Sequence, residues 1–353
     1  MTFKPLHRMS STPFVQRSPA PASLINPNEW FALQVLARRN ETRDIVVFDL
    51  ALPEGATLPQ FQAGAHLELQ IGGRVRHYSL CNPPEDRTHY RIAVQRESAG
   101  RGGSVQLCDG AAVGDTLWVR GPFNHFALRL PAARPPLLLA GGIGVTPVLC
   151  MALELTAAGL DFELHFSGRS LEHMAFLPLL RSGVFGRRVH LYADDGRGMA
   201  PMHLPTLLGS GKPGRHLYVC GPGGMIDAAD RIAREQGWAG DHIHFEHFGV
   251  PPAASTDVRA DGSCCEAFEV EIASTGRRIA VAADQNVVQA LAAAGVHIPM
   301  SCEVGVCGSC RTRVLAGVPD HRDLLLSPEE QATNQEFTPC CSRAKTPLLV
   351  LDL

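Results

Sequence analysis

Four cysteines near the C-terminus place the strongest constraint on what this chain can fold into. Cys302, Cys307 and Cys310 follow the spacing C-x4-C-x2-C on a glycine-containing loop, and Cys340 stands farther along the chain. This is the ligand spacing of plant-type [2Fe-2S] clusters. Zinc is the main alternative, but zinc sites usually combine two close cysteine pairs, and only one such pair is present. The spacing therefore predicts a [2Fe-2S] domain.

Composition sets the broad class of protein. The chain has 353 residues, 45% of them hydrophobic and 19% charged, so two or three domains are expected. Its most apolar stretch, residues 137–155, is broken by glycines and Pro147, which argues against a membrane span. The net charge of -3 gives no reason to expect nucleic acid as a partner. Eleven cysteines without a secretory signal favour reduced thiols and a cytoplasmic location over a disulfide scaffold.

The first part of the chain predicts a leader followed by an antiparallel β-barrel. Residues 1–28 contain five prolines and no acidic residue, which is typical of a disordered leader. Residues 29–130 alternate short β-like runs with turns rich in Gly, Pro, Asn and Asp. We expect strands over 31–36, 45–50, 66–71, 90–95 and 116–119, with a further strand ending at Ser79.

The rest of the chain predicts an α/β domain, a linker and a compact terminal domain. Over 131–248, strands at 137–140, 162–167, 189–193, 216–220 and 243–245 alternate with helices at 146–158, 171–181 and 224–236. Such alternation indicates a parallel sheet flanked by helices. Residues 249–266 form a linker without periodicity. Residues 267–353 hold the cysteine loop, strands at 268–273, 278–281 and 348–351, and a helix at 286–294.

Two motifs in the barrel region suit a flavin. Arg76, Tyr78 and Ser79 end a strand, and together they offer a cation for a phosphate, an aromatic face and a hydroxyl for the ring. Gly102, Gly103 and Ser104 stand at a helix start, where free N–H groups can bind phosphate. Taken alone, the first motif also fits an ordinary strand and the second a capped glycine turn.

Two glycine loops in the α/β region suit a nucleotide. Gly141, Gly142 and Gly144 follow a buried strand and precede a helix that begins near Thr146 and Pro147. They do not match G-x-G-x-x-G, which disfavours a Rossmann dehydrogenase. The segment Cys220-Gly221-Pro222, with Met225 beyond it, repeats the arrangement at a second strand end. Two such loops predict a ligand at the carboxyl edge of the sheet.

The motifs R-x-Y-S, G-G-I-G-x-T-P, C-G-P-x-x-M and the cysteine spacing occur here in that order. From about Glu29 to Leu353 the chain resembles the phthalate dioxygenase reductase / vanillate O-demethylase reductase family. The resemblance implies a flavin-binding antiparallel β-barrel, an α/β nucleotide domain similar to ferredoxin-NADP reductase, and a C-terminal β-grasp ferredoxin of the plant type. It also implies that Cys340, rather than the adjacent Cys341, is the fourth cluster ligand.

The resemblance assigns roles to individual residues. Ser79, Cys220 and Glu246 would be catalytic, with Ser79 at the flavin N5 and the other two beside the nicotinamide. The position of Gln95 departs from relatives that carry Lys there. The flavin residues would be Arg76, Tyr78, Ser79, Ala93, Val94, Gln95, Gly102, Gly103, Ser104, Thr146 and Phe248. The nicotinamide nucleotide would contact Gly141, Gly142, Gly144, Pro147, Arg169, Cys220, Gly221, Pro222 and Met225.

The implied function is an NADH-dependent reductase that passes electrons through FMN and a [2Fe-2S] cluster to a Rieske-type oxygenase, either an aromatic ring dioxygenase or an O-demethylase. FMN is favoured over FAD because no second motif would hold an adenine, and NADH over NADPH because residues 167–170 offer one cation, Arg169. The chain is expected to be a monomer.

Residues 267–353 hold seven Lys/Arg and ten Asp/Glu, and this acidic balance suits docking to an oxygenase of complementary charge. The alternatives are a stand-alone flavin or ferric reductase, and a redox-sensing protein without hydride transfer.

Overall fold

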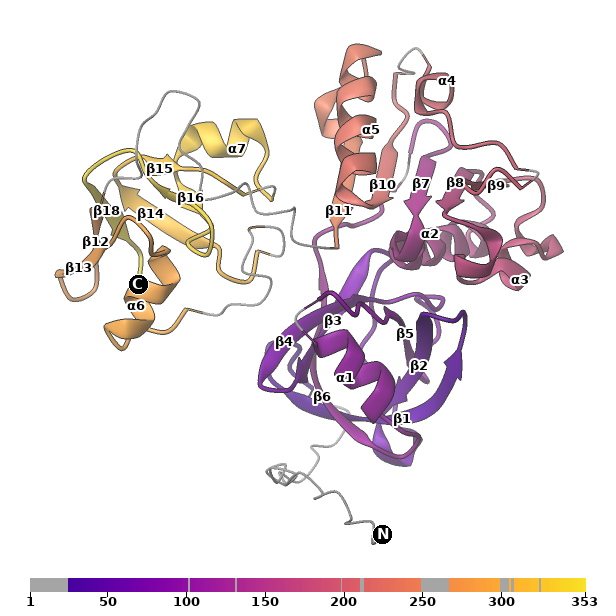
Figure 1. The fold of residues 1–353 in the computed structure, drawn as a ribbon, viewed down its shortest axis with the longest axis horizontal. Helices are drawn as coiled ribbons and strands as arrows, with labels where there is room; N and C mark the ends of the chain where they lie inside the picture. Colours follow the sequence, from indigo (N-terminus) through magenta and orange to yellow (C-terminus); the bar gives the residue numbers. More distant parts are fainter. Residues whose placement is uncertain are drawn as a thin grey trace, which may run out of the picture.

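The computed structural model describes residues 25–100, 102–130, 132–197, 199–209, 213–248, 267–298, 305, 308–323 and 325–353. Most of the expected leader, the expected linker, Cys302 and Cys307 lie outside the described residues. Three modules follow one another along the chain (Figure 1). We call them the barrel, the nucleotide module and the C-terminal module.

The barrel is a six-stranded antiparallel sheet in the order β4-β3-β6-β1-β2-β5. An isolated antiparallel bridge between Leu80 and Ile92 joins its two edges and closes it. Alternating apolar side chains such as Leu67 and Leu69 fill the interior, so the predicted barrel is confirmed. The strands are β1 (Phe31–Asn40), β2 (Ile45–Ala51), β3 (Ala65–Ile71), β4 (Arg74–Ser79), β5 (Tyr90–Gln95) and β6 (Thr116–Asn124), and helix α1 (Gly103–Gly110) lies over the sheet (Figure 1).

The nucleotide module is a five-stranded parallel sheet in the order β11-β10-β7-β8-β9. The predicted α/β alternation is therefore confirmed. Its strands are β7 (Leu137–Gly141), β8 (Glu163–Gly168), β9 (Val189–Ala193), β10 (Leu217–Gly221) and β11 (Ile243–His247). Its helices are α2 (Val145–Ala157), α3 (Leu177–Leu180), α4 (Leu204–Leu208) and α5 (Gly223–Glu235).

One predicted helix in this module is wrong. Residues 171–181 do not form a continuous helix; a 3-10 turn at Leu171–His173 is followed by the short α3. Phe176 between them has a φ of 62°, a left-handed conformation that a helix of L-residues cannot continue through. Pro178 then stands in the first turn of α3, where its missing N–H costs nothing.

The C-terminal module is a mixed sheet in the order β13-β12-β18-β14-β16, with a separate pair of β15 and β17. Asn286 caps α6 (Val287–Ala293) and Ser327 caps α7 (Pro328–Thr333), each through a reciprocal capping box. The expected strands and helix correspond to β12 (Phe268–Ile272), β13 (Arg277–Val281), α6 and β18 (Leu348–Leu351). Besides α7, the elements absent from the sequence prediction are β14 (Thr312–Ala316), β15 (Pro319–Asp320), β16 (Glu336–Phe337) and β17 (Arg343–Ala344).

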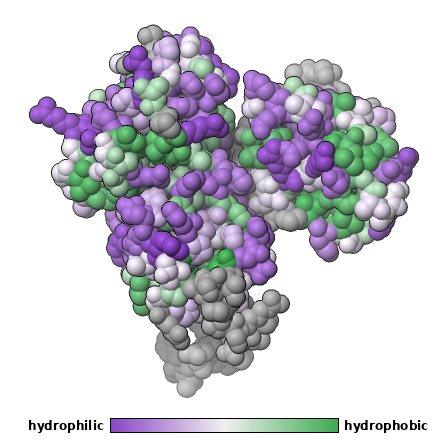
Figure 2. Space-filling view, turned by 180° about the vertical axis from the view of Figure 1, so that it is seen from behind, coloured by the Kyte–Doolittle hydropathy of each residue, from purple (hydrophilic) through white to green (hydrophobic). Residues whose placement is uncertain are grey.

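The three modules are arranged so that their edges meet. The carboxyl ends of the nucleotide-module strands point toward the barrel, and the C-terminal module stands beside both, nearest to β3 and β4 of the barrel (Figure 1). From behind, the C-terminal module is a distinct lobe whose surface mixes apolar and polar residues (Figure 2). Among the described residues, no helix is long and apolar enough to cross a membrane.

Candidate active site and iron–sulfur centre

The two glycine loops of the nucleotide module pack directly against each other. A Cβ on Gly144 would lie 2.3 Å from the carbonyl oxygen of Cys220, and one on Gly141 would lie 2.6 Å from Sδ of Met225. These approaches follow from the adjacency of β7 and β10 in the sheet. Only glycine fits at both positions, so the loops can bring backbone N–H groups together at one edge.

A pocket of about 560 Å³ opens at this edge. Its size is that of a site for a small ligand or cofactor. Of the predicted nucleotide-binding residues, Pro147 and Cys220 do not line it; Cys220 is fully buried. The predicted residues that do line it are Gly141, Gly142, Gly144, Arg169, Gly221, Pro222 and Met225, together with Gln95 and Phe248 from the predicted flavin set.

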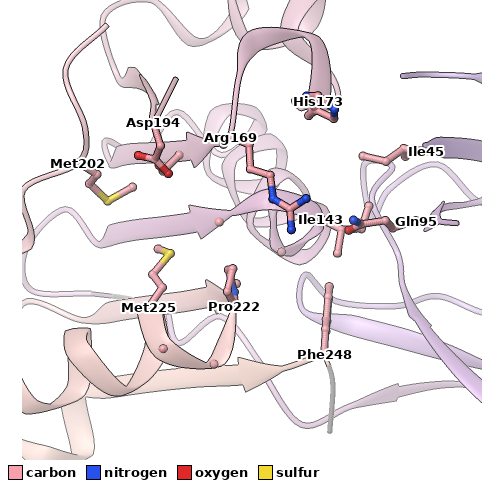
Figure 3. A pocket seen from close by; sticks show the side chains of 18 of the residues that line it. Ile45, Gln95, Ile143, Arg169, His173, Asp194, Met202, Pro222, Met225 and Phe248 are labelled. Atoms are coloured by element: carbon pink, nitrogen blue, oxygen red, sulfur yellow. The ribbon is translucent and has the colours of Figure 1, made fainter. Parts of the chain in front are cut away.

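The pocket runs between two chemically different ends (Figure 3). Gln95 and Phe248 lie at the barrel end, and Phe248 is 39% exposed, as suits a ring that packs on a ligand. Asp194 lies at the other end, and Arg169 points into the middle. Sequence reasoning missed Asp194, although it directly follows β9 and so stands at the carboxyl edge where ligands bind. It also missed five residues that belong to no motif: Thr42, Asp44, Ile45 at the start of β2, His173 and Met202.

The predicted phosphate-binding residues of the barrel lie together. Gly102 caps α1 with a left-handed φ of 84°, and a Cβ on Gly103 would lie 2.8 Å from Nε of Arg76. The side chain of Arg76 therefore packs closely against Gly103 in the first turn of α1. The hydroxyl of Ser104 accepts a hydrogen bond from the N–H of Glu97 at 3.1 Å. A cation beside helix N–H groups fits the phosphate of a flavin.

Four other predicted flavin residues are largely withdrawn from solvent. Burial raises the pKa of Tyr78, so its hydroxyl stays protonated. Ala93 and Val94 are buried in β5. Thr146 is 1% exposed and its hydroxyl donates to the carbonyl oxygen of Ile143 at 3.1 Å, so this side chain is already satisfied within its own loop.

The three predicted catalytic residues meet where the barrel adjoins the nucleotide module. The hydroxyl of Ser79 donates to Oε2 of Glu246 at 3.4 Å. Cys220 is the register partner of Glu246 across β10 and β11, and burial holds its pKa well above the usual value for a thiol. Burial also raises the pKa of Glu246 to about 8, against the opposing hydrogen bond from Ser79. Glu246 is thus a neutral carboxylic acid near neutral pH.

The described cysteines of the C-terminal module fit a cluster site. Cys310 and Cys340 are 2% and 4% exposed and pack in one small buried group with Val288. Sγ of Cys341 lies 3.2 Å from the Thr338 hydroxyl. Gly305 has a φ of 75°, and a Cβ there would lie 2.4 Å from Sγ of Cys341, so Gly305 itself lies close to Cys341. Two buried thiols packed together, one of them on the glycine-containing loop, suit an iron–sulfur cluster.

Known proteins match the same modules. The Oxidoreductase FAD-binding domain family matches residues 32–128, and the 2Fe-2S iron-sulfur cluster binding domain family matches residues 270–345. The vanillate O-demethylase oxidoreductase of a Pseudomonas species is 45% identical over 90% of this chain and 98% of its own length. The solved structure of phthalate dioxygenase reductase has a TM-score of 0.68 and 36% identity over 93% of this chain and 100% of that one. The chain belongs to the family of these reductases.

Membership fixes the broad activity. Proteins of the phthalate dioxygenase reductase and vanillate O-demethylase oxidoreductase family are the reductase components of oxygenase systems, and this chain is such an oxidoreductase with a flavin domain and a [2Fe-2S] domain. A second solved structure also matches most of the chain. A type IV self-sufficient cytochrome P450 monooxygenase has a TM-score of 0.80 and 40% identity, over 91% of this chain and 41% of that one.

Proposed function

We propose that the protein transfers electrons from NADH through FMN and a [2Fe-2S] cluster to a Rieske-type terminal oxygenase. A bound flavin supplies the conversion of a two-electron hydride donor into one-electron transfers, which the cluster relays. The observation that carries the proposal is the meeting of the nucleotide pocket with the barrel, where Ser79 contacts Glu246 and where Gln95 and Phe248 line the same pocket as the two glycine loops.

Each residue group has one task in this proposal. Arg76, Gly102 and Gly103 hold the flavin phosphate, and Tyr78 covers the ring. Ser79, whose hydroxyl donates to Glu246, would lie at the flavin N5. Glu246 would hold a proton on the nicotinamide side, with the buried thiol of Cys220 as its neighbour on β10. The proposed cluster ligands are Cys302, Cys307, Cys310 and Cys340. The proposed domains are residues 29–130, 131–248 and 267–353.

The choice of cofactors follows from the lining of the site. The domain family is described as FAD-binding. We nevertheless favour FMN, because the described flavin residues form a phosphate cradle without a further aromatic and basic pair for an adenine. NADH is favoured because Asp194 shares the pocket with Arg169, and a carboxylate repels the 2′-phosphate of NADPH.

The partner is proposed from the relatives and from charge. The names of the relatives include aromatic dioxygenase and O-demethylase systems, which favours a Rieske-type oxygenase. We propose a monomer in the cytoplasm, which meets this oxygenase through its C-terminal module with ten Asp/Glu against seven Lys/Arg.

The proposed function is tested by following electrons from one end to the other. The purified protein is expected to release FMN on denaturation and to show the absorbance of a [2Fe-2S] cluster. Anaerobic mixing with NADH should reduce flavin first and cluster second, and adding a purified Rieske oxygenase should reoxidise the cluster. Reduction of ferric iron, but not of the oxygenase, would support a stand-alone reductase. Failure of NADH to reduce the flavin would support the redox-sensing alternative.

A further inference from the structure

Glu68 on β3 is a buried carboxylate that belongs to neither the flavin cradle nor the nucleotide pocket. The residue is 3% exposed. Nε of Arg120 on β6 donates a hydrogen bond to Oε2 of Glu68, and Nε2 of His77 on β4 lies 3.2 Å from Oε1. The guanidinium of Arg120 is held in turn above the ring of Trp30, 5.1 Å from its centroid. The carboxylate is therefore fixed in place from two sides.

A third contact to Glu68 comes from the C-terminal module. The hydroxyl of Ser309 donates to Oε1 of Glu68 at 3.1 Å, although the two residues are 241 positions apart. Ser309 directly precedes Cys310, a proposed cluster ligand, so the hydrogen bond reaches the cluster-bearing segment itself. The same segment approaches the barrel at a second point, where Arg311 adds to the effects of burial and of His77 that lower the pKa of His125.

On the barrel, the contact lies next to the proposed flavin residues of β4. Glu68 and His77 are register partners across β3 and β4, and His66 and Ser79 are the next pair on the same face. His77 is followed in the chain by Tyr78 and Ser79. One strand pair thus carries the proposed flavin residues and the acceptor for Ser309, on the side of the barrel that faces the C-terminal module (Figure 1).

The charge of Glu68 makes it a strong acceptor. Burial by itself would raise its pKa, but the close contacts with the side chains of His77 and Arg120 outweigh burial and hold the pKa at about 2. A hydrogen bond to an ionised carboxylate is stronger than one between neutral groups. Because the donor on the C-terminal module is a neutral hydroxyl, the hydrogen bond can break and re-form without exposing a second charge.

We propose that Glu68 is a positioning residue that seats the cluster-bearing segment on the barrel through Ser309. The contact sets the rate of electron transfer between the two modules and leaves hydride transfer from NADH untouched. Because it is a polar contact to a single hydroxyl, the C-terminal module can leave it to meet the oxygenase. The inference rests on the proposed flavin and cluster sites.

The experiment compares four variants of the full-length holoprotein. Ser309→Ala removes the hydroxyl, Ser309→Thr keeps it, and Glu68→Gln keeps the shape of the side chain without its charge. Gln70→Ala is the matched control, because Gln70 is exposed on the same strand two positions from Glu68. Docking is read by hydrogen exchange of residues 65–79 and 308–316. Electron flow is read by stopped-flow absorbance, which separates flavin reduction by NADH from the later reduction of the cluster.

In Ser309→Ala and Glu68→Gln, the backbone amides of both segments are expected to exchange faster, because a hydrogen bond to a charged group is lost or weakened. Cluster reduction should slow at least about fivefold in both variants for the same reason. Flavin reduction should stay within about twofold of the wild type, since no change touches the nucleotide pocket. Ser309→Thr and Gln70→Ala should behave as the wild type, and all variants should keep the electron paramagnetic resonance spectrum of the reduced cluster.

Two results would overturn the inference: unchanged hydrogen exchange in Ser309→Ala, or a cluster-reduction rate in that variant equal to the wild type. Ser309→Ala decides the matter even where Glu68→Gln fails to fold, because it leaves Arg120 and His77 paired. Failure of the proposed function is seen separately, as a wild-type flavin that NADH does not reduce.

Discussion

Two acidic side chains, Glu246 and Glu68, contact the same face of β4, but their pKa values are shifted in opposite directions. Glu246 receives one hydrogen bond, from Ser79, and its pKa rises to about 8. Glu68 lies against His77, two positions earlier, and its pKa falls to about 2. Both carboxyl groups lose solvent. The difference lies in the partners, since only Glu68 has a guanidinium beside it.

The comparison separates the two sides of the flavin site by task. On the nucleotide side, an acid that is neutral at pH 7 can hold or release a proton without a fixed charge opposing an arriving hydride. On the C-terminal side, an acid that is always ionised is a constant acceptor for a neighbouring module. In the proposed function, hydride would thus enter beside a neutral acid, and electrons would leave beside a permanent charge.

The largest expected effect is loss of the cluster, which stops electron exit and leaves flavin reduction by NADH intact. Cys340→Ser should abolish the cluster absorbance, because a [2Fe-2S] core needs four protein ligands. NADH should still reduce the flavin at the wild-type rate. The matched control is Cys341→Ser, which should keep the cluster spectrum; loss of the cluster in that variant alone would make Cys341 the ligand instead.

The next effect acts on the entry side alone. Ser79→Ala removes the hydroxyl that contacts Glu246, and flavin reduction by NADH should slow on the order of tenfold or more, as when a positioned donor is lost at a reaction centre. The cluster spectrum should be unchanged. Single-turnover stopped-flow measures the rate, and an unchanged hydride-transfer rate would remove Ser79 from the proposed catalytic group.

A smaller effect concerns Asp194, a third carboxylate, which is exposed at the far end of the pocket. Asp194→Asn keeps the size of the side chain and removes its charge. The ratio of kcat/KM for NADPH to that for NADH should rise roughly tenfold, because repulsion of the 2′-phosphate is lost. Glu172→Gln is the control, because Glu172 is exposed and does not line the pocket, although His173 beside it does. An unchanged ratio would place nucleotide selection elsewhere.

The sequence predicts the glycine loops of the nucleotide module and the cluster cysteines better than the contact between the barrel and the C-terminal module, for a physical reason. Gly141, Gly144 and Gly221 stand at or just after the ends of strands within a repeating β-α pattern. The local sequence therefore predicts both glycine loops and their common place at the carboxyl edge of the sheet. Glu68 carries no such signal. It alternates with Leu67 and Leu69, which fill the barrel, and alternation assigns it to the outer, solvent face. One of its hydrogen-bond partners is Ser309, 241 positions away, and no local pattern shows that contact.

The remaining misses also involve tertiary context. The two-residue strands β15, β16 and β17 are too short for periodicity to reveal. The helix expected over 171–181 had the right apolar spacing, but the left-handed backbone at Phe176 interrupts it. Phe176 is buried, and its N–H donates to Glu41 of the barrel at 2.9 Å, so packing between modules overrides the local helical pattern.

The smallest expected effect tests the comparison of the two carboxylates directly, through the pH dependence of stability. The pKa of Glu246 is raised from 4.5 to about 8, so the folded state binds a proton that the unfolded state releases, and stability is lost as pH rises between those values. The pKa of Glu68 is lowered from 4.5 to about 2, so its contribution is complete above 4.5 and is lost only as pH falls toward 2.

Denaturant unfolding of Glu246→Gln, compared with wild type, should therefore show a relative gain in the free energy of unfolding that grows between about pH 5 and pH 8, on the order of 1–2 kcal/mol after discounting for partial exposure. Glu68→Gln should show a deficit that stays constant over the same range. Parallel pH curves for the two variants would mean that the two carboxylates share one charge state, and the division between a proton-holding and a charge-holding side would fail.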